Sequence, residues 1–198
     1  MTNCRDKYNS VRETVSFNHC PVKITNNYFN TNEGEGILFL DCSGVATDNY
    51  ILNINDAIEA TNCNNMKITN NFILNSGDDG IDVNYGFNIS VYNNTIIKSS
   101  DKGISLSLDS LSILNLIHNN ILISNHIGIG LEGNGTAMLN NNSYQNNDSK
   151  IFVEHPKTIT INSKKQNIGA KNIIYILVFF ITIMIFIKVF LRKNLNNK

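Results

Sequence analysis

The segment Ile68-Thr69-Asn70-Asn71-Phe72-Ile73 decides the fold of this chain, because the same phrase returns at a nearly constant interval. It reads Ile-Thr-Asn-Asn-Tyr-Phe at 24–29 and Val-Tyr-Asn-Asn-Thr-Ile at 91–96. Each repeat carries a pair of adjacent polar residues, and the six pairs are Asn26-Asn27, Asp48-Asn49, Asn70-Asn71, Asn93-Asn94, Asn119-Asn120 and Asn141-Asn142. Successive pairs are 22, 22, 23, 26 and 22 residues apart. A period of this length predicts a solenoid, in which each repeat stacks on its neighbours.

The apolar residues between the pairs predict strands. They are mostly Ile, Val, Phe and Leu in short alternating runs, interrupted by Asn, Gly and Asp, which is typical of strands and turns. No apolar stripe with helical spacing precedes the C-terminal segment, and the leucine spacing of leucine-rich repeats is missing. About 22 residues per turn accommodate three short strands and three bends. We therefore predict an all-β, single-stranded parallel β-helix of about seven turns over residues 13–162.

A second periodic motif sets the register of the turns. Isoleucines recur at the same interval and are expected to form one inward column, whose members are Ile37, Ile58, Ile81, Ile104, Ile129 and Ile151. Two residues after each isoleucine another apolar or small residue follows, as in a strand whose alternate side chains point inward. We expect the second residue of each pair to lie at a bend in the left-handed conformation. Those amides are also expected to bond to one another as a ladder, which contains Asn27, Asn49, Asn71, Asn94, Asn120 and Asn142.

Two segments resemble a known family. Ser76-Gly-Asp-Asp-Gly-Ile-Asp-Val83 and Asp101-Lys-Gly-Ile-Ser-Leu106 are similar to stretches of right-handed parallel β-helix repeat proteins of the pectin-lyase-like superfamily. NosD-like and bacterial surface β-helix proteins are the most similar kinds. The resemblance implies a right-handed coil outside the cytoplasm, often attached to a larger exported polypeptide. It does not select one activity, because this superfamily includes lyases, hydrolases, epimerases, adhesins and scaffolds.

The register gathers acidic residues on one outer face of the middle turns. They lie one to three residues from the stacked isoleucines, and they are Glu35, Asp56, Glu59, Asp78, Asp79, Asp82 and Asp101. Carboxylates stacked one turn apart repel, which raises pKa values or attracts a cation. Ca²⁺ is bound by such oxygen ligands. We therefore interpret these seven residues as candidates for glycan or cation binding, with Ca²⁺ as the one ion suggested. Ordinary turn residues without such a function are the alternative.

Part of this acidic set also resembles the catalytic motifs of polygalacturonase-type hydrolases. Asn55-Asp56 and Asp78-Asp79 match the first two aspartate motifs of those enzymes, in which paired acids serve as general acid and general base. An enzymatic interpretation would use Asp56, Asp78, Asp79 and Asp101. The next turn reads Asp101-Lys102-Gly103 instead of Gly-His-Gly, and no Arg-Ile-Lys motif follows. A polysaccharide-active hydrolase or lyase is therefore the alternative to a binding or structural module, and a truncated remnant without its own activity is a third.

Charge and cysteine content exclude other classes. The formal net charge is zero and 16% of residues are charged, so no basic stripe is present to bind nucleic acid. Cys20, Cys42 and Cys63 follow the repeat and are expected to form a column of small buried thiols. A disulfide between neighbouring turns is geometrically possible in such a column. The Cys and His spacing of a zinc site is missing.

The C-terminal part predicts a membrane anchor. Residues 173–191 are 19 residues with Lys188 as their one charge, long enough as a helix to cross the ~30 Å hydrocarbon core. A buried helix that caps the coil is the alternative. We predict a linker at 163–172, a transmembrane helix at 173–191 and a short basic, cytoplasmic tail at 192–198. Residues 1–12 are polar, form an incomplete first segment and lack a signal peptide. We therefore expect the C-terminal part of a longer exported protein, with the bilayer and polysaccharide as partners.

Overall fold

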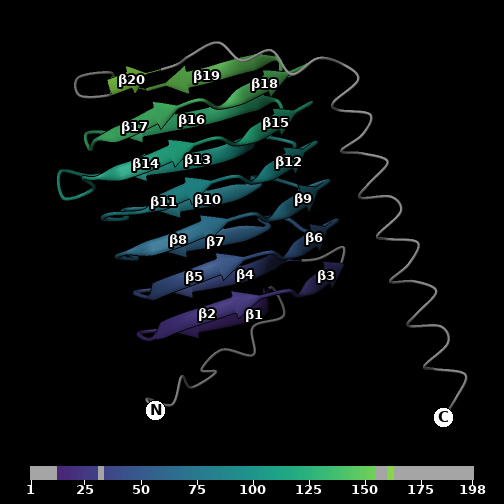
Figure 1. The fold of residues 1–198 in the computed structure, drawn as a ribbon, viewed down its shortest axis with the longest axis vertical. Helices are drawn as coiled ribbons and strands as arrows, with labels where there is room; N and C mark the ends of the chain where they lie inside the picture. The colour runs from purple at the N-terminus through teal and green to yellow at the C-terminus, as the bar shows by residue number, and fades with distance from the viewer. Residues whose placement is uncertain (1–12, 31–33, 155–159, 163–198) are drawn as a thin grey trace, which may run out of the picture. The chain divides into compact units, whose positions relative to one another are not determined.

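The computed structural model describes residues 13–30, 34–154 and 160–162, and these residues form twenty strands and no helix. Figure 1 shows the strands as a stack of turns that rises from β1 to β20. The strands are β1 (Glu13–Asn18), β2 (Pro21–Thr25), β3 (Tyr28–Asn30), β4 (Glu35–Leu40), β5 (Ser43–Thr47), β6 (Tyr50–Leu52), β7 (Ile58–Thr61), β8 (Met66–Thr69), β9 (Phe72–Leu74), β10 (Ile81–Asn84), β11 (Ser90–Tyr92), β12 (Thr95–Ile97), β13 (Lys102–Leu108), β14 (Asn115–His118), β15 (Ile121–Ile123), β16 (Ile127–Gly133), β17 (Ala137–Asn140), β18 (Ser143–Gln145), β19 (Ser149–Val153) and β20 (Thr160–Asn162).

Every third strand pairs in parallel, so the chain winds into three sheets. Sheet A has the order β1-β4-β7-β10-β13-β16-β19, sheet B the order β2-β5-β8-β11-β14-β17-β20, and sheet C contains β3, β6, β9, β12, β15 and β18. The prediction of a right-handed parallel β-helix is thus confirmed. The described strands form about six complete turns, and β19 and β20 begin the next, so the predicted number of seven was slightly too high.

The predicted flanking segments lie outside the described residues. These are the N-terminal residues 1–12, the linker 163–172, the apolar segment 173–191 and the tail 192–198. Within the described ranges, no helix has the length and apolar character needed to cross a bilayer.

The inward isoleucine column is confirmed. Sheet A pairs Ile37 with Ile58, and the same register continues through Ile81, Ile104, Ile129 and Ile151. The first five are fully buried, and Ile151 is partly buried. Two residues further along each strand, Phe39, Ala60, Val83, Leu106 and Leu131 are 0–1% exposed. These two columns form much of the interior, since alternate residues of each strand point into the coil.

The amide ladder is confirmed at the bend between sheets B and C. The Nδ2 of each ladder asparagine donates to the Oδ1 of the asparagine one turn above, over 2.9–3.1 Å from Asn27 to Asn142. The same Oδ1 also accepts from the backbone N–H of the asparagine below, as Asn94 does from Asn71 at 3.0 Å. Buried backbone carbonyls take further bonds, for example Ile68 from Asn94 Nδ2 at 2.9 Å. The ladder therefore satisfies the polar groups of a bend that lies inside the coil.

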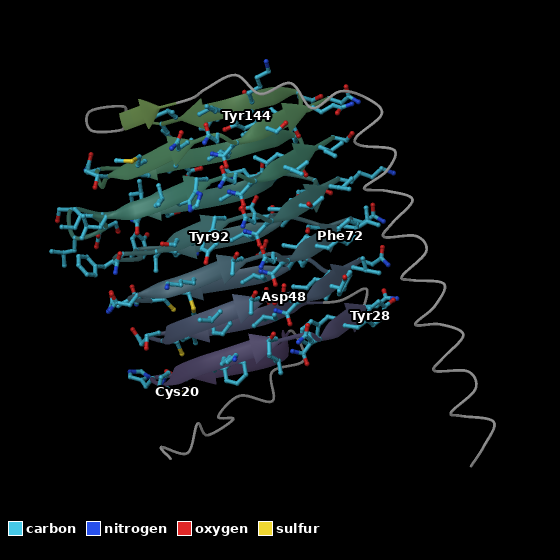
Figure 2. The ribbon with its side chains drawn as sticks, in the orientation of Figure 1. Cys20, Tyr28, Asp48, Phe72, Tyr92 and Tyr144 are labelled. Atoms are coloured by element: carbon cyan, nitrogen blue, oxygen red, sulfur yellow. The ribbon has the colours of Figure 1, made fainter. Side chains whose placement is uncertain are left out.

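The expected backbone conformation of the ladder residues was wrong. The first residue of each pair, not the second, is left-handed, with φ of 52–58° from Asn26 to Asn141. Asp48 occupies this position at the bend between β5 and β6 (Figure 2). Asn and Asp tolerate this region because their side chains bond locally. The left-handed residue turns the chain, so that the second amide points inward to the ladder.

The cysteine column is confirmed in part. Cys42 and Cys63 are buried free thiols, and the Cys42 backbone N–H points at Cys63 Sγ over 3.4 Å. Burial raises the pKa of Cys63 to about 12, which makes this thiol unreactive at neutral pH. Cys20 is buried as well but is disulfide-bonded, so the expectation of three thiols was wrong for it.

Candidate functional site

Six carboxylates from three successive turns lie on the outer side of sheet A. We call this set the acidic shelf, and it contains Glu35, Asp56, Glu59, Asp78, Asp79 and Asp82. The predicted register is confirmed, because Glu59 pairs with Asp82 across β7 and β10. Glu35 begins β4, while Asp56 and Asp79 each lie two residues before a strand. The shelf therefore follows directly from the repeat.

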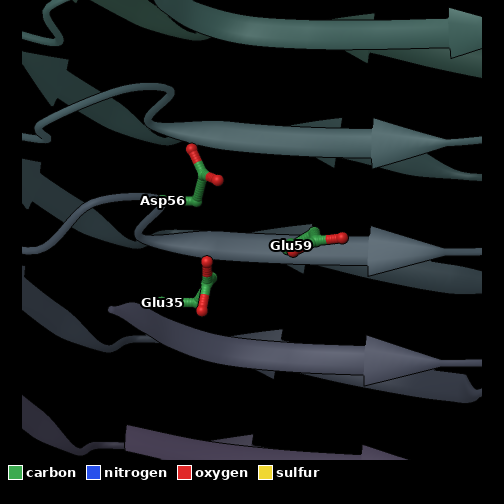
Figure 3. A group of neighbouring side chains, drawn as sticks. All are labelled: Glu35, Asp56 and Glu59. Atoms are coloured by element: carbon green, nitrogen blue, oxygen red, sulfur yellow. The ribbon is translucent and has the colours of Figure 1, made fainter. Parts of the chain in front are cut away.

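Two groups of three acids meet at Asp56. One carboxylate oxygen each from Glu35, Asp56 and Glu59 lie within 4.8 Å of one another (Figure 3), and so do one each from Asp56, Asp78 and Asp79. Asp78 is exposed, Asp79 is 7% exposed, and the others are half-buried. Asp56 is thus the one residue that both groups share.

Asp56 and Asp79 are held by backbone groups of the turn above. The Asp79 N–H donates to Asp56 Oδ1 at 2.8 Å, and the Lys102 N–H donates to Asp79 Oδ1 at 2.7 Å. Burial raises the pKa of both carboxyls to about 7, against these hydrogen bonds, which lower it. Neighbouring carboxylates such as Asp82 raise both pKa values further. Close to neutral pH, each group can therefore hold or release a proton.

Asp82 and Glu59 are fixed by side chains next to them. Asp82 accepts from Asn84 Nδ2 at 2.6 Å and from the Ser105 hydroxyl, yet burial raises its pKa. Glu59 accepts from Thr61 Oγ1 at 2.9 Å.

Lys102 occupies the next position in the Asp56–Asp79 column and ends it with a positive charge. Its Nζ lies 2.6 Å from Asp101 and 3.6 Å from Glu132. Burial alone would lower the pKa of Lys102, but the hydrogen bond to Asp101 and the charge of Asp79 outweigh it and raise the pKa. Its stem crosses Gly130, where a Cβ would lie 2.3 Å from Lys102 Cδ. A side chain at position 130 would therefore displace the lysine.

The structure separates the predicted acids into two kinds. Six form the shelf, in which Asp82 pairs with Glu59 and the other five make up the two groups of three, whereas Asp101 is bound to Lys102. Sequence reasoning missed the partnership of Lys102 with Glu132 and Gly130. Among the described strands, the outward column of sheet A contains a single glycine, Gly130, and this was the signal for it. The other members of the column are Ser16, Leu38, Glu59, Asp82, Ser105 and Phe152.

The arrangement suits a hard cation or shared protons. Each group of three supplies oxygen ligands, and Ca²⁺ takes six to eight of these. In inverting glycosidases the two carboxyl groups lie ~6.5–9.5 Å apart, whereas within each group of three one oxygen of each acid lies within 4.8 Å of the others. The described histidines have partners of their own, since His126 lies 3.0 Å from Asp148, His19 lies 3.4 Å from Asp41 and His118 stacks on Tyr92.

Comparison with known proteins agrees with this architecture. A family model for the right-handed beta helix region matches residues 13–168. No curated protein and no solved structure matches the chain.

Proposed function

Because the chain belongs to the right-handed β-helix family, we propose that it is a membrane-anchored, extracytoplasmic surface module that binds carbohydrate through a divalent cation. The supporting observation is the acidic shelf, in which two groups of three carboxylates share Asp56 on one outer face. The alternative within this proposal is a surface module with a purely structural role, which binds neither the cation nor carbohydrate.

The cation would act as a bridge. Carboxylates on an open face occupy one side of a Ca²⁺ ion, and sugar hydroxyl or carboxylate oxygens can fill its remaining positions. Because the pKa of Asp56 and of Asp79 is about 7, protons compete with the cation below neutral pH. Binding should therefore weaken as the pH falls from 8 to 6.

Calcium titration of the full-length chain tests the site. We expect Asp56→Asn to weaken Ca²⁺ binding by about tenfold or more, because it removes one ligand from both groups. Asp148→Asn is the matched control, since Asp148 is an exposed acid outside the shelf. A glycan array with and without Ca²⁺ then tests the bridge. Equal Ca²⁺ affinity in both variants would refute the cation site. Glycan binding that does not depend on Ca²⁺ would refute the bridge.

Vesicle flotation tests the membrane anchor. The apolar segment 173–191 supports insertion by its length. We expect the full chain to float with phosphatidylcholine vesicles and to resist alkaline extraction. Two central charges, Phe180→Arg with Ile183→Arg, should abolish flotation, because each charged residue costs about 2.5–3.5 kcal/mol at the centre of the bilayer. A wild-type chain that alkali extracts completely would refute the anchor.

A polysaccharide-active enzyme is the second candidate, and one observation favours it. Asp56 and Asp79 lie in one three-acid group and both have a pKa of about 7, as a general acid and base need. Release of reducing ends or unsaturated products from acidic polysaccharides would reveal it. That activity should be lost in Asp79→Asn and retained in Asp148→Asn.

A further inference from the structure

The longest step of the repeat creates an apolar loop. Asn94 and Asn120 are 26 residues apart, and the additional residues lie at 109–114, between β13 and β14. The loop exposes Leu111 by 75%, Leu114 by 65% and Ile113 by 42%. Single exposed apolar residues are common, but a contiguous group of them marks an interaction surface.

The loop is held in one shape by its own polar groups. The Asp109 carboxylate accepts from the Leu111 N–H at 2.9 Å and from the Ser112 N–H and hydroxyl at 2.8 Å each. Ser112 is fully buried, and its carbonyl accepts from the Thr136 N–H at 2.8 Å. Gly135 packs so closely beneath the loop that a Cβ would lie 2.6 Å from the Ser112 carbonyl oxygen. The exposed leucines are therefore held in place by a hydrogen-bonded turn.

The same bonds hold the one charge of the loop against its own backbone. Asp109 is its one charged residue, and the Ser112 hydroxyl and the two N–H groups lower the pKa of its carboxyl. The carboxylate thus lies against the backbone of its own turn. The remaining loop side chains are serine, leucine and isoleucine. The leucines and the isoleucine favour an apolar environment, and the Ser112 hydroxyl is already bonded to Asp109.

The apolar surface continues from the loop onto sheet B. Met138 is 46% exposed. A hollow of about 410 Å³ lies between it and the loop, lined by Leu114, Asn115, Leu116, Thr136, Ala137 and Met138. We call Leu111, Ile113, Leu114 and Met138 the apolar edge.

The path of the chain brings a particular partner to this edge. Met138 pairs with Thr160 of β20, the last described strand, so these residues are ~4.8 Å apart across the sheet. Ten residues, 163–172, separate β20 from the apolar segment 173–191. Ten residues reach at most ~33–36 Å. A bilayer that holds 173–191 would therefore lie within reach of the apolar edge.

We propose that the apolar edge inserts into the surface of the bilayer as a second, interfacial contact beside the C-terminal anchor. This inference rests on the membrane attachment proposed above. Leucine, isoleucine and methionine would enter the boundary between headgroups and acyl chains. The linker lysines Lys164, Lys165 and Lys171 would favour an anionic leaflet. Contact at sheet B would also leave the acidic shelf, on sheet A, away from the anionic lipid.

Tryptophan fluorescence tests the contact, because the chain contains no tryptophan. Leu111→Trp in the full-length chain is reconstituted into phosphatidylcholine–phosphatidylglycerol vesicles with and without brominated acyl chains. Phe152→Trp is the matched control, since Phe152 is 42% exposed on sheet A in the last described turn. We expect brominated lipid to reduce Leu111→Trp emission roughly twofold, because an interfacial side chain reaches the acyl boundary. The Phe152→Trp emission should not change.

The outcomes separate the two proposals. Vesicle-bound chain with no quenching at position 111 overturns the apolar-edge contact and leaves the anchor intact. Chain that does not float with vesicles overturns the anchor and this inference together. A third outcome is a blue shift of the emission at position 111 that grows with protein concentration and does not depend on brominated lipid. It would show that the apolar edge contacts a second copy of the chain, and it would also overturn the bilayer contact.

Discussion

Two polar columns run along this solenoid, and they solve the same geometric problem in different ways. The amide ladder and the Asp56–Asp79 column both stack polar groups one turn apart. In the ladder, every Nδ2 donates to an Oδ1 above it, from Asn27 to Asn142. In the acidic column, Asp56 accepts from the Asp79 backbone N–H and Asp79 accepts from the Lys102 backbone N–H, so these bonds do not join one side chain to the next.

The difference follows from donors and acceptors. A carboxamide has both, so identical copies stack indefinitely. A carboxylate only accepts, so identical copies repel and must take up protons, a cation or an ammonium group. The ladder can therefore lie buried as structure from Asn49 to Asn142. The acidic column lies just before β7 and β10, with Asp56 half-buried and Asp79 7% exposed, and its burial raises the pKa of both carboxyls. Exchanging or removing members of the two columns tests this difference.

The largest effect is expected when a carboxylate enters the ladder. Asn94→Asp removes the Nδ2 bonds to Asn120 Oδ1 and Ile68 O and sets a buried charge beside the Asn71 amide. We expect the free energy of unfolding at pH 8 to fall by about 3–5 kcal/mol. Urea denaturation followed by circular dichroism measures this change.

The neighbouring position is the matched control for that exchange. Asn93→Asp places the same carboxylate at an exposed left-handed residue, where the repeat itself carries Asp48. It should cost under about 0.5 kcal/mol. Equal losses in the two variants would show that burial within the ladder is unimportant.

The second effect concerns pH. Asp56 and Asp79 have a folded pKa of about 7, raised from 3.8. The two carboxyls therefore make their full contribution to the free energy of unfolding below pH 4, and this contribution is lost as the pH rises through 7. We expect this pair to contribute about 2–4 kcal/mol less to stability at pH 8 than at pH 5. The double variant Asp56→Asn with Asp79→Asn should flatten that dependence, and an unchanged slope in urea titrations would contradict it.

The third effect tests the end of the acidic column. Lys102→Met keeps the apolar stem over Gly130 and removes the charge between Asp101 and Glu132. We expect a loss of about 1–2 kcal/mol at pH 8, and a smaller loss at pH 5, where Asp79 is protonated. Lys67→Met, an exposed lysine on β8, should change stability little. Equal effects of the two variants at both pH values would argue against an electrostatic role for Lys102.

The repeat predicted the fold because its period reports directly on stacking. Ile58, Ile81 and Ile104 follow from spacing alone, and so does the ladder. The shelf followed as well, since Glu59 and Asp82 inherit the same register. Spacing could not predict the backbone conformation at each bend or the paths of side chains that cross between turns. The left-handed turn at Asn70 instead of Asn71 depends on backbone packing. The path of Lys102 over Gly130 depends on a long side chain that crosses between turns.

The smallest effect sharpens the role of burial. Asn75 Nδ2 donates to Asn53 Oδ1 at 3.1 Å, and Asn53 Nδ2 donates to Asn30 Oδ1 at 3.0 Å, which makes a short exposed ladder at the bend after sheet C. Asn75→Asp removes its donor and retains a residue that tolerates the left-handed conformation, φ 59°. Water can replace the lost partner, so we expect under about 0.5 kcal/mol in urea titrations. If Asn75→Asp lowers the free energy of unfolding as much as Asn94→Asp does, the amides stabilise the coil only through their bonds to one another. Charge and burial would then not explain the difference between the ladder and the acidic column.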